Sequence, residues 1–436
     1  MGGGLLQLVA YGAQDAYLSG NPQITFWKGL YKRHTNFAME PFRINFNGQP
    51  SWGTKQTAIV GRHADLLFSS YVEVQLPYAD TTGAAAALWN HGLLNGKTQI
   101  QAPLGFNLIN HVELDIGGQI IDRQYSEFMY LWSCLTSDHN KATKLNAMLQ
   151  STLNTGNLQL ANPPGCAYGG NGRPSLPNTV YIPLMFFFTK NPGAALPLIA
   201  LQYHEVKINV FWKEPLEIAG NFTQAAKLPQ ATSAALYIDY IYLDTEERRR
   251  FAQQSHEYLI EQVQFNEDVG ISSPSQRIDL TFNHPVKELI WIVQPHCYTD
   301  CKAPLKYGRN GATTRLIPYQ YDQSAVYEQW LQINGQDRLD RRYGDYFNQV
   351  QPYQHHTGLA PDSGVYSYSF AVKPEENQPS GTCNFSRIDT ATIVMTMDGS
   401  VNVDQASGDT WDVRVYAINY NVLRIMSGMG GLAYSN

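Results

Sequence analysis

The chain has 436 residues, of which 31 are basic and 37 acidic, so its net charge of −6 is the opposite of what direct nucleic-acid binding requires. Hydrophobic residues make up 43%, which is enough for packed cores and excludes a wholly disordered chain. Charged residues make up only 16%, against about 25% in an average soluble domain, so we expect partners to cover much of the surface.

Targeting signals are not apparent in the sequence. The first residues, Met1-Gly-Gly-Gly-Leu-Leu-Gln, lack the basic segment and the apolar core of a secretory signal. Apolar runs stay well short of the roughly 18 residues that span a bilayer. The 5 cysteines are scattered and odd in number, which is typical of reduced thiols in a protein made inside a cell.

Most predicted elements are short strands. Apolar and polar residues alternate over 70–76, 205–211 and 237–243, and this period of two predicts half-buried strands. One helix is predicted over 126–136, because large apolar residues recur there at helical spacing, namely Phe128, Leu131, Trp132 and Leu135. A polar insertion rich in Asn, Gly and Pro follows at 133–178.

The most informative feature is an internal repeat. Ile116-Gly-Gly-Gln119 followed by Ile121-Asp-Arg-Gln-Tyr125 recurs as Ile333-Asn-Gly-Gln336 followed by Leu339-Asp-Arg-Arg-Tyr343. Further segments pair in the same order along the two halves: 42–47 with 261–266, 71–77 with 289–295, 180–188 with 365–372, 205–212 with 390–397, and 236–244 with 413–421.

The repeat predicts the fold. Each copy holds about eight strand-like segments and no crossover helices, a pattern that closes best as a sandwich of two antiparallel sheets, the jelly roll. The sequence therefore predicts an all-β double jelly roll with long loop insertions and a few short helices. Its expected parts are an N-terminal arm at 1–26, a first jelly roll at 27–244, a solvated or partner-facing linker at 245–256 and a second jelly roll at 257–436.

Catalytic signatures are missing from the sequence, including the phosphate-binding loop, the nucleophile elbow and the His-Glu-x-x-His motif. The best metal candidate is His296-Cys297-Tyr-Thr-Asp300-Cys301, but it has no second ligand pair, so an ordinary loop with free thiols is favoured. His355 and His356 are expected to form a surface or internally satisfied pair. The adjacent carboxylates at 246–247 and 375–376 are not placed as an acid and a base. We expect neither catalytic activity nor a cofactor.

Several blocks resemble a known family. The opening Leu5-Leu-Gln-Leu-Val-Ala-Tyr-Gly-Ala-Gln-Asp15 and the late block Gln378-Pro-Ser-Gly-Thr-Cys-Asn-Phe-Ser-Arg-Ile-Asp389 are similar to the major capsid proteins of large icosahedral (nucleocytoplasmic) DNA viruses, nearest to the chlorella-virus, or phycodnavirus, type. The other matching blocks are 20–26, 31–37, 192–206, 243–252, 256–261, 334–338, 346–348 and 419–434.

The resemblance carries expectations for function. It implies a double jelly roll, as the repeat predicts independently, and homotrimeric pseudo-hexameric capsomers that tile an icosahedral shell. The implied partners are neighbouring capsomers, minor capsid and penton proteins, the inner membrane nearby and the host surface through the outer loops. The protein would be made and assembled in the host cytoplasm and reside in the virion.

The two ends of the chain are rich in glycine, at 2–4 and 427–431, and are expected to be flexible and closely packed. The N-terminal arm is also apolar, so it is not expected to remain in water. In the family this arm lies at the base of the capsomer. We therefore expect both termini to face the membrane side of the shell.

Loops at 78–105, 133–178, 213–234 and 297–325 depart from the family pattern. Relatives are glycosylated on such loops at atypical asparagines in Gly/Thr-rich segments, which makes Asn310 a glycosylation candidate. Asn221 is a second candidate because it begins the sequon Asn221-Phe-Thr223, although without a secretory signal we expect such sequons to stay unused.

Two other functions compete with a shell subunit. Jelly rolls also serve as glycan-binding modules, in which an exposed Trp89 or Trp411 could stack on sugars. A cupin-like metalloenzyme would need several histidines and a carboxylate on inner strands, and the 11 histidines do not cluster in that way.

Overall fold

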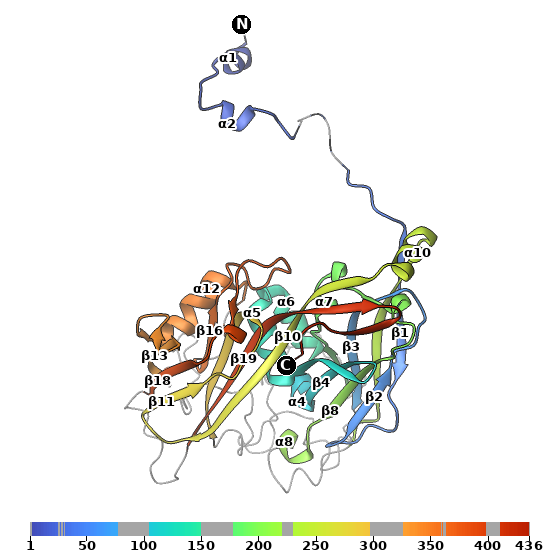
Figure 1. Ribbon diagram of the computed structural model, residues 1–436, viewed down its shortest axis with the longest axis vertical. Helices are drawn as coiled ribbons and strands as arrows, with labels where there is room; N and C mark the ends of the chain where they lie inside the picture. The colour runs from blue at the N-terminus through green and yellow to red at the C-terminus, as the bar shows by residue number, and fades with distance from the viewer. Residues whose placement is uncertain are drawn as a thin grey trace, which may run out of the picture. The chain divides into compact units, whose positions relative to one another are not determined.

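The computed structural model describes residues 2–24, 27, 29, 31–76, 104–149, 178–219, 230–296, 326–358, 360, 363–397 and 410–435. The chain consists of two compact units, Met1–Phe37 and Ala38–Asn436. The first unit contains two short helices, α1 (Gly3–Val9) and α2 (Ala16–Ser19), and its large apolar side chains are exposed (Figure 1). The second unit contains the β-sheets.

The first half of the chain forms one jelly roll. Its strands are β1 (Phe37–Asn45), β2 (Lys55–Ile59), β3 (Leu66–Leu76), β4 (Ile109–Ile116), β5 (Gln119–Tyr125), β6 (Asn178–Pro183), β7 (Leu196–Pro197), β8 (Val206–Trp212) and β9 (Ser233–Leu243). One sheet has the order β1-β9-β3-β6, with β7 pairing β3, and the other has the order β2-β8-β4-β5. The strand pairs with a described register are antiparallel.

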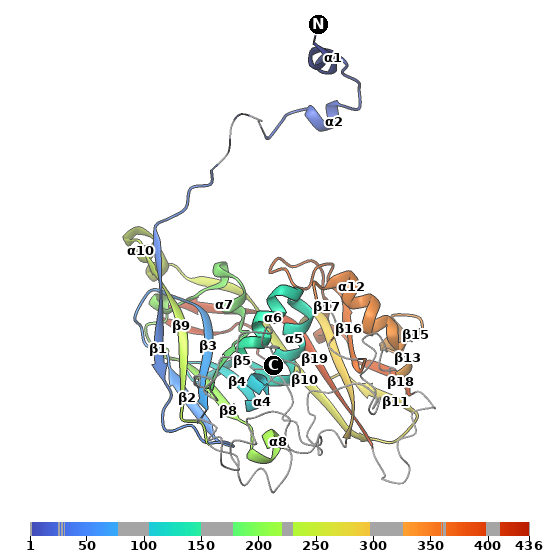
Figure 2. The same ribbon diagram turned by 180° about the vertical axis from the view of Figure 1, so that it is seen from behind.

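The second half repeats this topology. Its strands are β10 (His256–Ile271), β11 (Ser275–Asp279), β12 (Pro285–Pro295), β13 (Val326–Ile333), β14 (Gln336–Asp337), β15 (Arg342–Tyr343), β16 (Val365–Ser369), β17 (Cys383–Asn384), β18 (Ala391–Met397), β19 (Trp411–Met426) and β20 (Met429–Leu432). The sheet orders β10-β19-β12-β16 and β11-β18-β13-β14 match those of the first half strand for strand. The fold is therefore a double jelly roll, as predicted, and its two rolls lie side by side in both views (Figure 2).

Short helices connect the strands. They are α4 (Leu104–Leu108), α5 (Ser126–Thr136), α6 (His139–Met148), α7 (Phe187–Lys190), α8 (Pro215–Ala219), α10 (Thr245–Gln253) and α12 (Gln351–His355), together with a π-helical turn, η4 (Tyr346–Val350), and the 3₁₀ turns η2 (Pro192–Ala194), η3 (Leu198–Ala200) and η5 (Phe385–Arg387). Within the described part of the chain, none of the helices has the length and apolar character to cross a bilayer. The predicted helix at 126–136 is confirmed as α5.

The repeated motifs occupy equivalent turns. Ile116 pairs with Gln119 at the end of the β4–β5 hairpin, and Ile333 pairs with Gln336 at the end of the β13–β14 hairpin. Both two-residue loops have positive φ at both positions, +62° and +89° in Gly117-Gly118 and +50° and +76° in Asn334-Gly335. This is the type I′ turn that tight hairpins favour. The other paired segments also lie on equivalent strands, so the sequence repeat is a structural repeat.

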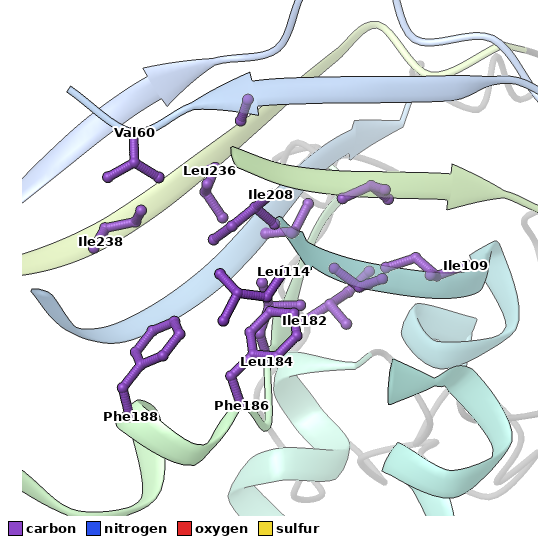
Figure 3. Packing of buried hydrophobic residues seen from close by; sticks show 14 of the residues in the cluster. Val60, Ile109, Leu114, Ile182, Leu184, Phe186, Phe188, Ile208, Leu236 and Ile238 are labelled. Atoms are coloured by element: carbon purple, nitrogen blue, oxygen red, sulfur yellow. The ribbon is translucent and has the colours of Figure 1, made fainter. Parts of the chain in front are cut away.

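The core of the first roll follows from alternation along its strands. Val72 and Val74 of β3 point between the two sheets, while Tyr71 and Glu73 point to the outer face. Figure 3 shows the packing of this core, in which residues of both sheets meet, among them Val60, Leu114, Ile182, Ile208, Leu236 and Ile238. The second roll has its own core, which includes Leu289, Trp291, Tyr366 and Val415.

The segment between the rolls, predicted as a solvated or partner-facing linker, contains the helix α10. Asp244 caps α10, because its side chain accepts a hydrogen bond from the Thr245 N–H at 2.8 Å. Glu246 and Glu247 lie in the first turn and Arg250 in the last, which suits the helix dipole. None of its side chains is fully buried, in accordance with the expected solvated character.

The glycine-rich C-terminal segment forms strand β20 rather than a loose end. The Tyr203 N–H donates to the Gly428 oxygen at 2.9 Å, and a Cβ at Gly430 would lie 2.7 Å from Leu201 Cδ2. Glycine is therefore needed here for close packing, as expected, but the segment is an ordered strand against the first roll.

Candidate functional site

Helix α5 lies at the junction between the two jelly rolls (Figure 2). It follows β5 directly, and one face carries four buried apolar side chains, Phe128, Leu131, Trp132 and Leu135. They pack on the outer face of the β10-β19-β12-β16 sheet, against Val263, Ile290, Ile292, Val365, Tyr416 and Ile418. Each large apolar side chain buried in this way contributes about 1.5–3 kcal/mol, so α5 joins the rolls into one unit.

An ion pair from the first turn of α5 crosses the same junction. The Arg414 guanidinium of β19 donates from Nε to Glu127 Oε2 at 2.8 Å and from Nη2 to Glu127 Oε1 at 2.9 Å. The Tyr416 hydroxyl donates to Glu127 Oε2 at 2.6 Å, and burial raises the Tyr416 pKa well above its ordinary value. Arg414 also donates to Gln294. The bidentate geometry fixes the angle at which α5 meets the second roll.

A second charged cluster links α7 to the second roll. Glu261 of β10 accepts a hydrogen bond from Lys190 Nζ at 2.9 Å and another from Lys287 of β12. Burial alone would raise the Glu261 pKa, but the two ammonium groups lower it to about 2. Lys190 Nζ also lies 4.7 Å from the centroid of the Trp132 ring, a cation–π contact with α5.

A buried histidine lies at the end of α12. His356 Nδ1 is 3.1 Å from Glu375 Oε1, and Nε2 is 2.5 Å from Glu288 Oε1 of β12. Burial alone would lower the His356 pKa, but the Glu288 and Glu375 carboxylates raise it to about 9. The imidazole is therefore protonated at neutral pH, and both ring N–H groups donate. Its ring meets the Trp132 ring edge to face, with centroids 6.1 Å apart.

A buried carboxyl joins β5 to β10. Asp122 accepts hydrogen bonds from the Val263 N–H at 3.1 Å and from Gln124 Nε2 at 2.6 Å. Burial raises the Asp122 pKa to about 6. Asp122 belongs to the repeated motif of the first half, so the motif supplies a contact between the rolls in addition to its hairpin.

The candidate metal segment lies mostly outside the described residues, since only His296 of 296–301 is described. The ring atom Nδ1 of His296 lies 2.8 Å from Asp412 Oδ2, and the backbone N–H of His296 donates to the backbone oxygen of Thr410. In the parts of the chain that the structure describes, no group of three or more His, Cys, Asp or Glu residues is arranged to hold a metal ion.

The other chemical candidates have structural partners. His355 Nδ1 lies 3.1 Å from the Val372 oxygen, and His356 is satisfied by carboxylates, as predicted for this pair. Glu375 binds His356, whereas Glu376 binds Lys373 at 2.7 Å, so the two adjacent carboxylates serve separate ion pairs.

Trp411 is not a sugar-stacking residue. The glycan-binding hypothesis required it to be exposed, but its side chain is only 5% exposed and packs in the core of the second roll. The prediction for Trp411 was wrong because the residue begins β19 with its ring directed between the sheets. Trp89 and the glycosylation candidates Asn221 and Asn310 lie outside the described residues.

The buried charges at the junction were not predicted from the sequence. Lys287 and Glu288 stand within an otherwise apolar strand, Pro285-Val-Lys-Glu-Leu-Ile-Trp. Charged residues in such a run are costly unless they are paired, so their presence is the signal that could have indicated buried ion pairs.

Comparison with known proteins gives one family for both halves. The family described as "Major capsid protein N-terminus" matches residues 25–244, and that described as "Large eukaryotic DNA virus major capsid protein" matches residues 247–431. The major capsid protein of Phaeocystis pouchetii virus is 42% identical, and that of Paramecium bursaria Chlorella virus 1 is 40% identical, each alignment covering 100% of both chains.

Solved structures agree. The crystal structure of PBCV-1 VP54 has a TM-score of 0.73 and 36% identity, covering 94% of this chain and 100% of that chain. The Faustovirus major capsid protein has a TM-score of 0.68 at 13% identity, covering 95% of this chain and 94% of that chain, and so shares the fold.

Proposed function

Because the chain belongs to the major capsid protein family of large eukaryotic DNA viruses, we propose that it forms homotrimeric, pseudo-hexameric capsomers that tile an icosahedral shell. It is a structural capsid protein and a virion component. The observation that supports the trimer is the duplicated jelly roll, since three chains with two equivalent rolls each place six similar units around a threefold axis. A head-to-tail contact of this kind is stable against further growth only when the ring closes.

The structure supplies the properties that such a subunit needs. The two rolls are joined by an apolar junction and by buried ion pairs, which suits a building block that keeps one shape. We assign 27–244 to the first roll, 245–256 to the linker and 257–436 to the second roll.

Further roles follow from the family. We propose that the chain has no catalytic activity and that its partners include neighbouring capsomers, minor capsid proteins and penton proteins. The apolar arm at 1–26 and the C-terminus would face the membrane side of the shell, and the outer loops with Asn221 and Asn310 would carry any glycans and host contacts. Assembly would take place in the host cytoplasm.

Light scattering after size exclusion, over a dilution series of the full chain, tests the trimer. We expect a mass three times the 49.0 kDa of the chain, and hexagonal particles with a threefold axis in negative-stain images. A folded, cooperatively melting monomer at every concentration would overturn the capsomer.

A further inference from the structure

The duplication relates α5 to the helical segment η4–α12 of the second roll. Both segments begin after equivalent motifs, which end at Tyr125 and Tyr343. Counted in step from these tyrosines, Met129 corresponds to Phe347. Both side chains are about 1% exposed or less, and each packs in the core of its own roll. At this position the two segments direct equivalent side chains into the cores of their own rolls.

Three of the four α5 residues that bind the second roll have counterparts that remain exposed. Continuing in step, Leu131, Trp132 and Leu135 correspond to Gln349, Val350 and Tyr353. The α5 residues are buried at the junction, whereas Val350 is 39% exposed and Tyr353 is 82% exposed. We call Gln349, Val350 and Tyr353 the exposed helical face.

The sheet surface that α5 covers also has a counterpart. In the second roll this surface is the outer face of β10-β19-β12-β16, and in the first roll it is the outer face of β1-β9-β3-β6. On the latter, the Tyr71 ring stacks on Tyr237 with centroids 5.2 Å apart and meets Tyr181 edge to face at 5.9 Å. These three rings, with Glu73 and Asp239, are partly or largely exposed and form what we call the tyrosine face.

We propose that the exposed helical face of one chain packs on the tyrosine face of a second copy, repeating between chains the contact that α5 makes within one chain. The inference rests on the proposed trimer and names its interface. Within one chain, the helix of the first roll packs on the outer sheet of the second roll. When the helix of the second roll packs in the same way on the first roll of the next chain, the contact is head-to-tail, and three chains close the ring.

The chemistry of the two faces suits a contact that forms after folding. The surface under α5 combines apolar side chains with charged groups that are buried and paired, such as Arg414 with Glu127, whereas the tyrosine face combines partly exposed aromatic rings with partly exposed carboxylates, so it can stay in water until it is covered. The two faces also complement each other in charge. Arg341 and Arg342 are exposed beside the helical face, with Arg342 lying 4.8 Å from the centroid of the Tyr346 ring, opposite in sign to Glu73 and Asp239.

The first experiment compares the parent chain with the double variant Val350→Asp/Tyr353→Asp by light scattering across a dilution series. A matched control is Val269→Asp, because Val269 is also exposed but lies on β10. We expect the double variant to dissociate at a concentration at least ten-fold higher than the parent, and the control to behave as the parent. Melting curves show whether the parent, the double variant and the control all fold. We expect that they do, because the substituted positions are exposed.

The second experiment uses the chain with both Tyr237→Cys and Tyr353→Cys and a short bismaleimide cross-linker. We expect covalent dimers and trimers on denaturing gels for this chain, and neither for the two single variants, which also report any contribution of the native cysteines. A trimeric parent with no cross-link and an unchanged double Asp variant would overturn this interface while leaving the capsomer intact. A monomeric parent would overturn both.

Discussion

The ion pair between Glu127 and Arg414 offers a direct test of the junction. We predict that Glu127→Gln destabilises the chain by about 3 kcal/mol, the lower end for a broken buried pair, because the Arg414 charge loses its bidentate partner but keeps the Glu267 carboxylate at 3.8 Å. The magnitude follows from burial: the two side chains are 13% and 10% exposed, and the pair has two short hydrogen bonds. The Tyr416 hydroxyl also loses its charged acceptor.

The measurement is denaturant unfolding followed by tryptophan fluorescence, at one protein concentration for all variants because assembly adds to apparent stability. The matched control is Glu257→Gln, which breaks a surface pair with Arg424 whose side chains are 59% and 52% exposed. We expect a cost of about 1 kcal/mol or less for the control. The double variant Glu127→Leu/Arg414→Met should recover most of the loss, since it removes both charges. If Glu127→Gln costs no more than the control, the junction does not depend on this pair.

Three further predictions concern pH and backbone geometry. The folded-state pKa of His356 is raised from 6.5 to about 9, so the stability that its charged form contributes is complete below pH 6.5 and is lost as pH rises through 9. The variant His356→Gln should therefore show a weaker dependence of the unfolding midpoint on pH over that range. A pH profile equal to that of the parent would contradict the assignment. The folded-state pKa of Asp122 is raised from 3.8 to about 6, so the native state loses stability as pH rises from about 4 through 6; Asp122→Asn should be more stable than the parent at pH 8, and equal stability there would refute the argument. Asn334→Ala should cost about 2 kcal/mol, because Asn334 has φ +50° and accepts hydrogen bonds from the Asp389 and Thr390 N–H groups, while Asn334→Gly should cost less; calorimetry that ranks them in the opposite order would contradict the type I′ turn.

Repetition and periodicity were sufficient to predict the architecture. Helix α5 was predicted because its apolar spacing is local, and the equivalence of the two hairpins was predicted because the same turn needs the same residues at positive φ. The junction was not predictable in this way. The pairing of Glu127 with Arg414, or of Glu261 with Lys190, joins residues far apart in the chain, and alternation does not specify which partner a buried charge will meet.

The same limit explains two smaller differences. Trp411 stands at the start of a strand, where the sequence does not determine which of two faces its ring will take, and the structure directs it inward. The glycines at 427–431 predicted close packing, but the element they pack against, around Leu201 and Tyr203, is contributed by the other roll.

The position of the C-terminal hairpin has a consequence for the order of synthesis. Leu423 and Ile425 belong to the core of the first roll, and β20 closes against Leu201 and Tyr203, so residues that are synthesised after the second roll complete the first. Domains usually fold in the order in which they are made. Here the first roll lacks part of its core until β20 has been synthesised, so a chain that stops before β20 cannot form a finished first roll.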